Sequence, residues 1–247
     1  MAEPVIPDFG EASDCVTDNR LFCPDWVREN WDPVLQPALV QHIYLTAIAV
    51  IVGFAISFGL AVWSVRRRAV YAPITAITGV LYTIPSLALF AALVPVTGLR
   101  SIVTAEVPLI LYTLLIFVRS IVTGFDNVPG EVLESADGMG YESRRRLMRV
   151  ELPLATPLVI AGLRLATVST IGLVVVTGIL GDGFGGLGYF IFEGYRRSFF
   201  TETIFGAVPL MLMAIAADVA FIRLQRRLTP WSRPRTAAED PSMATAT

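Results

Sequence analysis

Five apolar segments constrain the fold of this chain more than any other feature. They lie at residues 43–65, 73–94, 107–124, 157–180 and 203–222. Each is close to the roughly twenty predominantly apolar residues that a helix needs to cross a bilayer. Hydrophobic residues make up 54% of the chain and charged residues 16%, a balance too apolar for an ordinary soluble domain. We therefore predict an all-α polytopic membrane protein with about five transmembrane helices.

The distribution of arginine predicts the orientation of these helices. The chain has no lysine, and twelve arginines follow the first, third and fifth segments: Arg66, Arg67, Arg68, Arg144, Arg145, Arg146, Arg149, Arg223, Arg226, Arg227, Arg233 and Arg235. The opposite loops hold Arg100, Arg196 and Arg197. Loops rich in arginine favour the cytoplasmic side. We therefore expect the N-terminus outside, the C-terminus in the cytoplasm and the protein in a bacterial cell membrane.

The two ends of the chain differ from its centre. Residues 1–37 hold eight acidic residues against Arg20 and Arg28, and they lack the basic start and apolar core of a signal peptide. We expect an acidic extracytoplasmic tail at 1–37, a transmembrane domain at 38–230 and a disordered cytoplasmic tail at 231–247. Trp26 and Trp31 suit either the membrane interface or burial against the outer helix ends.

Cys15 and Cys23, the only cysteines, both lie in the tail assigned to the outside. Segments outside the cytoplasm can keep disulfides that cytosolic segments lose. The eight-residue separation leaves enough chain to turn back, so we predict a disulfide between them.

The charged segment 126–156 lies between the third and fourth apolar segments. Pro129 suits the first turn of a short helix, with Asp126 and Asn127 as candidate caps. Gly138 and Gly140 should end that helix, and a side chain at Gly140 should obstruct the tight elbow. A second helix is expected over residues 142–150, ended by Pro153, because proline lacks an amide donor and restricts the residue before it.

The spacing in this segment resembles the EAA loop of ABC-importer permeases. That pattern is Glu-Ala-Ala, three residues, Gly, nine residues, Ile, one residue and Leu-Pro, with Ser135 and Val150 as small departures. The resemblance implies a MetI-like fold and a loop that couples the membrane helices to a cytoplasmic ATPase through Glu134, Ser135, Ala136, Gly140, Leu152 and Pro153. An ordinary cytoplasmic loop is the alternative.

Further phrases resemble the osmoprotectant subgroup of these permeases. They lie at residues 41–46, 83–89, 161–167, 183–188 and 226–230, so the resemblance covers about residues 38 to 230. It implies transport of a quaternary amine such as glycine betaine, carnitine or choline. Another small polar solute, such as an amino acid, is the alternative substrate class.

The same resemblance implies several partners. They are a cytoplasmic ABC ATPase dimer, a second permease subunit of the same or a paralogous chain, an extracytoplasmic substrate-binding protein and membrane lipid; nucleic acid is not expected. The chain has no GxxxxGK[ST] motif, so ATP and Mg²⁺ should bind the partner ATPase. No cofactor is expected on this chain itself.

Catalytic and metal sites are not expected, because His42 is the only histidine and can form neither a histidine cluster nor a Ser/His/Asp triad. A polytopic membrane enzyme is the alternative from a different functional class. The lack of a group of polar catalytic residues in the spans argues against it. A secondary transporter ranks third, since no inverted repeat is evident.

Pro85 and a glycine run are candidates for a gate or pathway. Pro85 should kink the second span, either as a gate or as a packing feature. Gly183, Gly185, Gly186 and Gly188 satisfy the GxGxxG pattern, but the flanking membrane spans exclude a dinucleotide site in a βαβ unit. The run suits a channel mouth, a flexible docking loop or a plain turn.

Three charges lie within or near the spans, where each is costly unless it is paired or close to the interface. They are Arg119, Arg164 and Asp218. We expect structural ion pairs or helix-end contacts for them in preference to a transport role.

Overall fold

The computed structural model describes residues 15, 18, 20–99, 101–181 and 184–232, and every regular element in these ranges is helical. In chain order they are α2 (Pro24–Asn30), η1 (Trp31–Leu35), α3 (Gln36–Arg66), η2 (Arg68–Val70), α4 (Tyr71–Thr83), α5 (Ser86–Thr97), α6 (Ile102–Asp126), α7 (Gly130–Gly138), α8 (Ser143–Arg146), η3 (Leu147–Glu151), α9 (Leu152–Thr177), η4 (Gly178–Leu180), α10 (Leu187–Arg196), α11 (Phe200–Leu228) and η5 (Pro230–Ser232). The predicted all-α fold is confirmed.

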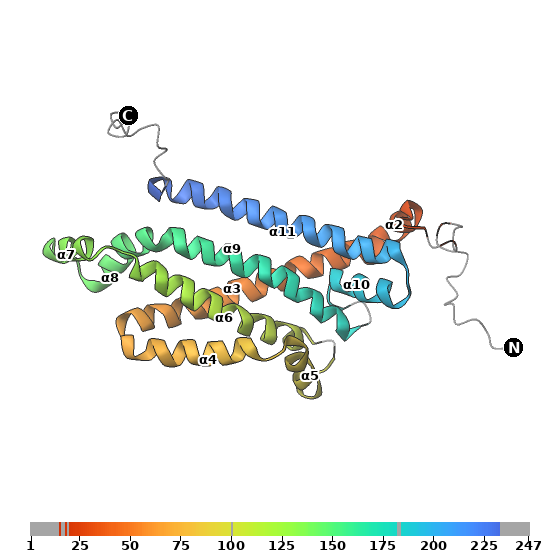
Figure 1. Ribbon diagram of the computed structural model, residues 1–247, viewed down its shortest axis with the longest axis horizontal. Coiled ribbons are helices and arrows are strands. Elements are labelled where there is room, and N and C mark those ends of the chain that lie inside the picture. Colours follow the sequence, from red (N-terminus) through yellow and green to blue (C-terminus); the bar gives the residue numbers. More distant parts are fainter. Residues whose placement is uncertain (1–14, 16–17, 19, 100, 182–183, 233–247) are drawn as a thin grey trace, which may run out of the picture.

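The long helices run along one axis of the molecule (Figure 1). Helix α6 is central: it packs against α3 and α9, while α4 covers α6 and α11 packs against α9 and α10. Helices α7 and α8 lie at one extremity, which we call the α7 end, and α2, α5 and α10 lie at the other, the α10 end (Figure 1). Neighbouring spans therefore position two distinct sets of connections at opposite ends.

Small residues allow the central helices to approach closely. A Cβ atom at Gly53 of α3 would lie 1.9 Å from the Thr113 hydroxyl of α6, and one at Gly162 of α9 would lie 2.4 Å from the Ser120 Cβ of α6. Large side chains then fill the remaining space, with Phe117 and Ile121 of α6 fully buried. Because lipid is as apolar as these side chains, such close packing is what holds membrane helices together.

The second apolar segment differs from its prediction. A single kinked helix over residues 73–94 was expected, but the chain forms α4 and α5, which meet at an angle of 87°. Ile84 and Pro85 are extended, with ψ of 126° and 128°, because proline drives the preceding residue out of the α region. The break is therefore sharper than a proline kink, and this segment crosses only as a bent pair.

Two further elements lie outside the predicted spans. The ten-residue helix α10 is too short to span a bilayer, so the pattern of long apolar segments did not predict it. Near the N-terminus, one helical stretch begins at Pro24 and continues to Arg66. Residue 37, the predicted boundary between the tail and the transmembrane domain, lies inside this stretch. Residues 233–247 of the predicted C-terminal tail lie outside the described residues.

Candidate functional site at the loop between α6 and α9

A glycine-centred cap turns the chain sharply after α7. The Tyr141 amide donates to the Ala136 carbonyl at 3.1 Å and the Gly140 amide donates to the Asp137 carbonyl at 2.9 Å. This pair of bonds is the Schellman motif, which requires a left-handed residue, and Gly140 has φ of +75°. A Cβ atom at Gly140 would meet no atom within 4 Å. The expected obstruction is therefore wrong, and the requirement for glycine comes from the backbone.

The second half of the loop is continuous with the membrane helix. A helix over residues 142–150 that ends at Pro153 was expected, but α8 passes through the π-helical turn η3 directly into α9. The Leu152 amide donates to the Leu147 carbonyl, five residues earlier. This wider turn provides room for the ring of Pro153, whose missing donor is harmless in the first turn of α9. Residues 143–177 are thus helical without a break.

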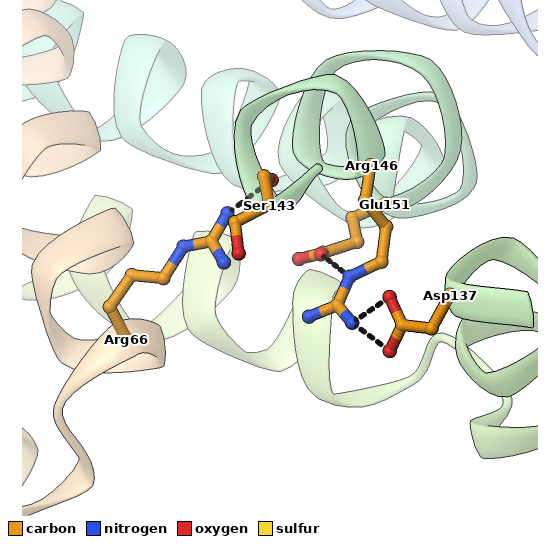
Figure 2. Close-up of polar contacts among 5 residues, drawn as sticks. All are labelled: Arg66, Asp137, Ser143, Arg146 and Glu151. Carbon is orange, nitrogen blue, oxygen red and sulfur yellow. Dashed lines mark hydrogen bonds and ion pairs between the residues drawn. The ribbon is translucent and has the colours of Figure 1, made fainter. Parts of the chain in front are cut away.

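Arg146 joins the two halves of the loop (Figure 2). Its Nε donates to Glu151 Oε1 at 2.9 Å, and its Nη1 donates to Asp137 Oδ1 at 2.6 Å. Glu151 is only 5% exposed, so Arg146 supplies the cation that a buried carboxylate needs. The bridge holds the C-terminal turn of α7 against the start of α9.

Two arginines, one at the end of α3 and one at the start of η2, attach the loop to the rest of the bundle. Arg66 donates to the Ser143 carbonyl at 2.8 Å (Figure 2), and Arg68 pairs with Asp126. Asp126 and Asn127 are not the caps of α7 that the sequence predicted. The Asn127 side chain donates to the Thr123 carbonyl at 2.7 Å and therefore closes α6.

The predicted coupling residues separate into buried and exposed sets. Ala136 is 1% exposed and Leu152 packs against the central core cluster, whereas Glu134, Ser135 and Gly140 are exposed. Met139, beside the elbow, is 68% exposed. The buried residues anchor the loop, and the exposed ones form a surface that another protein can contact. Pro153 is half-buried at the start of α9.

The roles of Arg146 and Glu151 were missed in the sequence. Five positions separate them, whereas side chains on an α-helix meet at a spacing of three or four. The η3 turn changes that register and brings them together.

The break between α4 and α5 has polar contacts of its own. The Tyr112 hydroxyl donates to the Ile84 carbonyl, and the Thr83 hydroxyl donates to the Val80 carbonyl at 2.7 Å. Pro85 is exposed at this point. The neighbouring Tyr82 ring lies 5.4 Å from the Tyr112 ring, centroid to centroid. The freed backbone groups are thus partly satisfied by side chains, as membrane proteins require at helix breaks.

The described glycines of the run 183–188 are packed against α3, α9 and η4. The Gly185 and Gly186 amides donate to Gln41 Oε1 at 3.0 and 2.8 Å. A Cβ atom at Gly186 would lie 2.7 Å from the His42 Cβ, and one at Gly188 would lie 2.2 Å from the Val175 carbonyl oxygen. Gly183 lies outside the described residues. These glycines therefore serve close packing at the α10 end.

His42 completes this packing. Its Nδ1 accepts from the Leu187 amide at 3.3 Å, so its Nε2 donates to the Ile171 carbonyl at 3.0 Å. The ring thereby joins α3, α9 and α10.

Glu106 was also missed in the sequence, because it lies one residue before the predicted third span. It is buried in α6, and neither carboxylate oxygen has a hydrogen-bond partner among the described residues.

The remaining predicted charges and cysteines make structural contacts. Arg164 of α9 pairs with Asp218 of α11, with a distance of 3.0 Å between Nη2 and Oδ2, so the expected ion pair is confirmed for these two. Arg119 is exposed. Cys15 and Cys23 are joined in a disulfide. The Cys23 amide donates to the Thr201 hydroxyl at 2.9 Å, which docks the segment on the start of α11.

The two tryptophans pack against the same region. Trp26 lies 5.2 Å from Phe199, and Trp31 lies 6.2 Å from Phe205, between ring centroids. Both rings therefore contact aromatic residues at helix ends, and Trp31 stays 43% exposed.

Beside these contacts, α10 carries an ion cluster in which Glu193 pairs with Arg196 and Arg197. The hydrogen bond from Arg196 lowers the pKa of the Glu193 carboxyl below its usual range. The cluster lines a cavity of about 500 Å³ at the α10 end.

Comparisons with known proteins agree with this geometry. Residues 38–234 match the family model described as binding-protein-dependent transport system inner membrane component. The choline transport system permease protein OpuBB of Bacillus subtilis is 36% identical over 190 residues, which cover 77% of this chain and 86% of the relative. The osmoprotectant import permease protein OsmW of Salmonella typhimurium is 35% identical over 194 residues, covering 77% and 89%.

A third relative and a solved structure extend these matches. The glycine betaine/carnitine/choline transport system permease protein OpuCB of Bacillus subtilis is 33% identical over 190 residues, covering 77% of this chain and 86% of the relative. A chain of the MetNI methionine ABC transporter, in an inward-facing conformation, superposes with a TM-score of 0.70 at 22% identity, covering 81% of this chain and 99% of that chain. This likeness concerns the fold.

Proposed function

Because this chain belongs to the family of binding-protein-dependent transport system inner membrane components, we propose that it forms the membrane pathway of an ATP-driven importer of quaternary-amine osmoprotectants. The observation that carries the proposal is the loop at the α7 end, which has an exposed elbow on one side and a continuous connection to α9 on the other. A partner ATPase dimer would bind ATP and Mg²⁺, and a second permease subunit would complete the pathway.

The orientation follows from the arginines. Arg66 and Arg68 lie next to the loop, and the C-terminal end of α11, with Arg226 and Arg227 in its last turn, lies at the same end of the molecule (Figure 1). Concentrated arginine favours the cytoplasmic side. The α7 end would then face the ATPase, and the α10 end would face the binding protein.

Coupling would proceed through the loop as a single rigid unit. Closure of the ATPase dimer displaces the exposed surface around Glu134 and Met139. The bridge from Asp137 through Arg146 to Glu151 prevents α7 from rotating independently of α9, so the displacement reaches the membrane helix. Packed helices that switch between two arrangements can convert a small displacement of the loop into opening of the pathway to the other side of the membrane.

The substrate class is supported by the names of relatives. OpuBB is named for choline, OpuCB for glycine betaine, carnitine and choline, and OsmW for osmoprotectants. The sequence identity of these relatives, 33% to 36%, is higher than the 22% to the methionine transporter. A quaternary amine is therefore preferred over an amino acid as the substrate.

The test uses the full chain assembled with its native partners in membranes. Uptake and ATP hydrolysis are measured with choline, glycine betaine, carnitine, proline and methionine. Stimulation by the quaternary amines alone is expected. If only methionine or proline stimulates both activities, the substrate class is wrong.

Coupling is tested with a matched pair of variants on α7. Glu134→Ala should reduce substrate-driven uptake at least about tenfold, the effect of removing an interface hot spot, without lowering membrane abundance. Glu131→Ala, which removes an exposed acid from the first turn of the same helix, should retain uptake. Normal uptake in Glu134→Ala would refute the coupling role.

A further inference from the structure

We propose that Tyr82 and Tyr112, at the break between α4 and α5, form a subsite that binds the quaternary ammonium group of the substrate within the membrane. This proposal rests on the proposed function and specifies where the pathway recognises its substrate. The two rings line a cavity of about 160 Å³ between α4, α6 and α9, together with Thr113, Ser169, Thr170 and Leu173.

The two rings pack against each other and line the same cavity. Their centroids are 5.4 Å apart and their planes are inclined by 54°. Tyr112 is held in place because its hydroxyl donates to the Ile84 carbonyl. The contact also ties the middle of α6 to the break, so the geometry of the ring pair depends on the bend itself.

The end of α4 adds a negative potential. The last four carbonyls of a helix have no partner within the helix and carry the negative end of its dipole. Here α5 cannot continue the ladder, because it departs at 87°. The Thr83 hydroxyl satisfies one of these carbonyls, that of Val80. Helix ends of this kind at membrane depth bind cations in transporters with discontinuous helices.

The chemistry of the site suits a quaternary ammonium group. That group has no N–H, so hydrogen-bond acceptors cannot recognise it, whereas the faces of aromatic rings attract it. No carboxylate lines the cavity, so binding would be weak enough for release, as passage through a membrane requires. The Tyr82 and Ser169 hydroxyls make no hydrogen bond within the described ranges and are available to the oxygen atoms of choline or glycine betaine.

The experiment introduces a single reactive thiol into this cavity. The two native cysteines of this chain are bonded to each other, so Ser169→Cys provides the only free thiol of this chain. The variant is studied as the full chain assembled with its partners. Its modification rate is measured with a methanethiosulfonate that carries a trimethylammonium group and with a neutral methyl methanethiosulfonate. The ratio of the two rates reports the preference for the cation.

We expect choline to protect the thiol. The rate ratio should fall about tenfold in Tyr82→Leu and in Tyr112→Leu. It should persist in Tyr82→Phe, which keeps the ring, and in the matched control Tyr71→Leu, which removes a tyrosine from the opposite end of α4. An unchanged ratio in both leucine variants, or an equal fall in Tyr71→Leu, would overturn the subsite.

A second measurement covers the case in which Ser169→Cys does not insert. Choline uptake is competed with 3,3-dimethylbutan-1-ol, the uncharged carbon isostere of choline. The preference for choline over the uncharged isostere should be smaller in Tyr82→Leu than in the native chain, and unchanged in Tyr71→Leu. The same preference in Tyr82→Leu as in the native chain would refute the subsite. Failure of the native chain to import any quaternary amine would instead refute the proposed function, and the thiol ratio does not depend on that outcome.

Discussion

At the scale of single residues, the backbone at Gly140 determines the shape of the exposed loop. Its positive φ is accessible to glycine at little cost, whereas a residue with a Cβ pays roughly 1–2 kcal/mol. The surroundings are open. The cost of substitution should therefore follow the backbone preference of the new residue rather than its volume.

This reasoning predicts an order among substitutions. Gly140→Ala and Gly140→Val should each weaken the cap by about 1 kcal/mol or more, while Gly140→Asn should cost less, because asparagine tolerates the left-handed region. Hydrogen exchange at the Tyr141 amide measures the cap directly. Gly138→Ala, in the helical part of α7, is the control and should leave exchange unchanged. Equal protection in Gly140→Val and the native chain would contradict the prediction.

Residue patterns predicted the position of this loop but not its internal bridge. Gly140 and Pro153 were identified from spacing, because glycine and proline impose local backbone rules. The pairing of Arg146 with Glu151 depends on the π-helical turn between them. Any of the four arginines in residues 144–149 could have been the partner, and the choice is made by tertiary packing around a buried carboxylate.

At the scale of elements, four of the five predicted spans are continuous helices, because length and apolarity alone determine whether a helix can cross. The second span was misjudged. A proline within an apolar run predicts a bend in the helix. The angle of that bend depends on which groups replace the lost backbone hydrogen bonds. Here the Tyr112 hydroxyl, 28 positions away, stabilises a full break.

The ion pair between α9 and α11 provides a prediction at the same scale. Arg164→Gln and Asp218→Asn should each lower the thermal stability and membrane abundance of the protein, because one charge remains without its partner in an apolar setting. The double variant should be more stable than either single variant. Arg119→Gln serves as the control. Thermal stability in detergent measures the series, and additive losses in the double variant would show that the two charges act independently.

At the scale of the whole molecule, the disulfide should order one end of the protein without supporting the bundle. Closing an eight-residue loop is worth about 2.5 kcal/mol on the chain-entropy model. Cys15→Ser, which spares the buried Cys23, should increase hydrogen exchange in α2 and at the start of α11 and leave α6 protected. Increased exchange throughout α6 would contradict this local role.

The distribution of arginine predicted which helix connections lie at each end of the molecule. It did not predict how the helices pack against one another. Helix α10 and its contacts with α3 were not predicted, because Gln41 and His42 bind amides about 145 positions away. Such contacts join residues whose types suit many other environments.

The docking of Cys23 on Thr201 has a consequence for biogenesis. The two residues are 178 positions apart, so the ribosome must synthesise α11 before the first helix finds its final neighbour. Until then, the surfaces of Trp26 and Trp31 that later meet Phe199 and Phe205 stay uncovered. The contact between the first and last membrane helices therefore forms late, and it distinguishes a completely inserted chain from one whose translation stopped early.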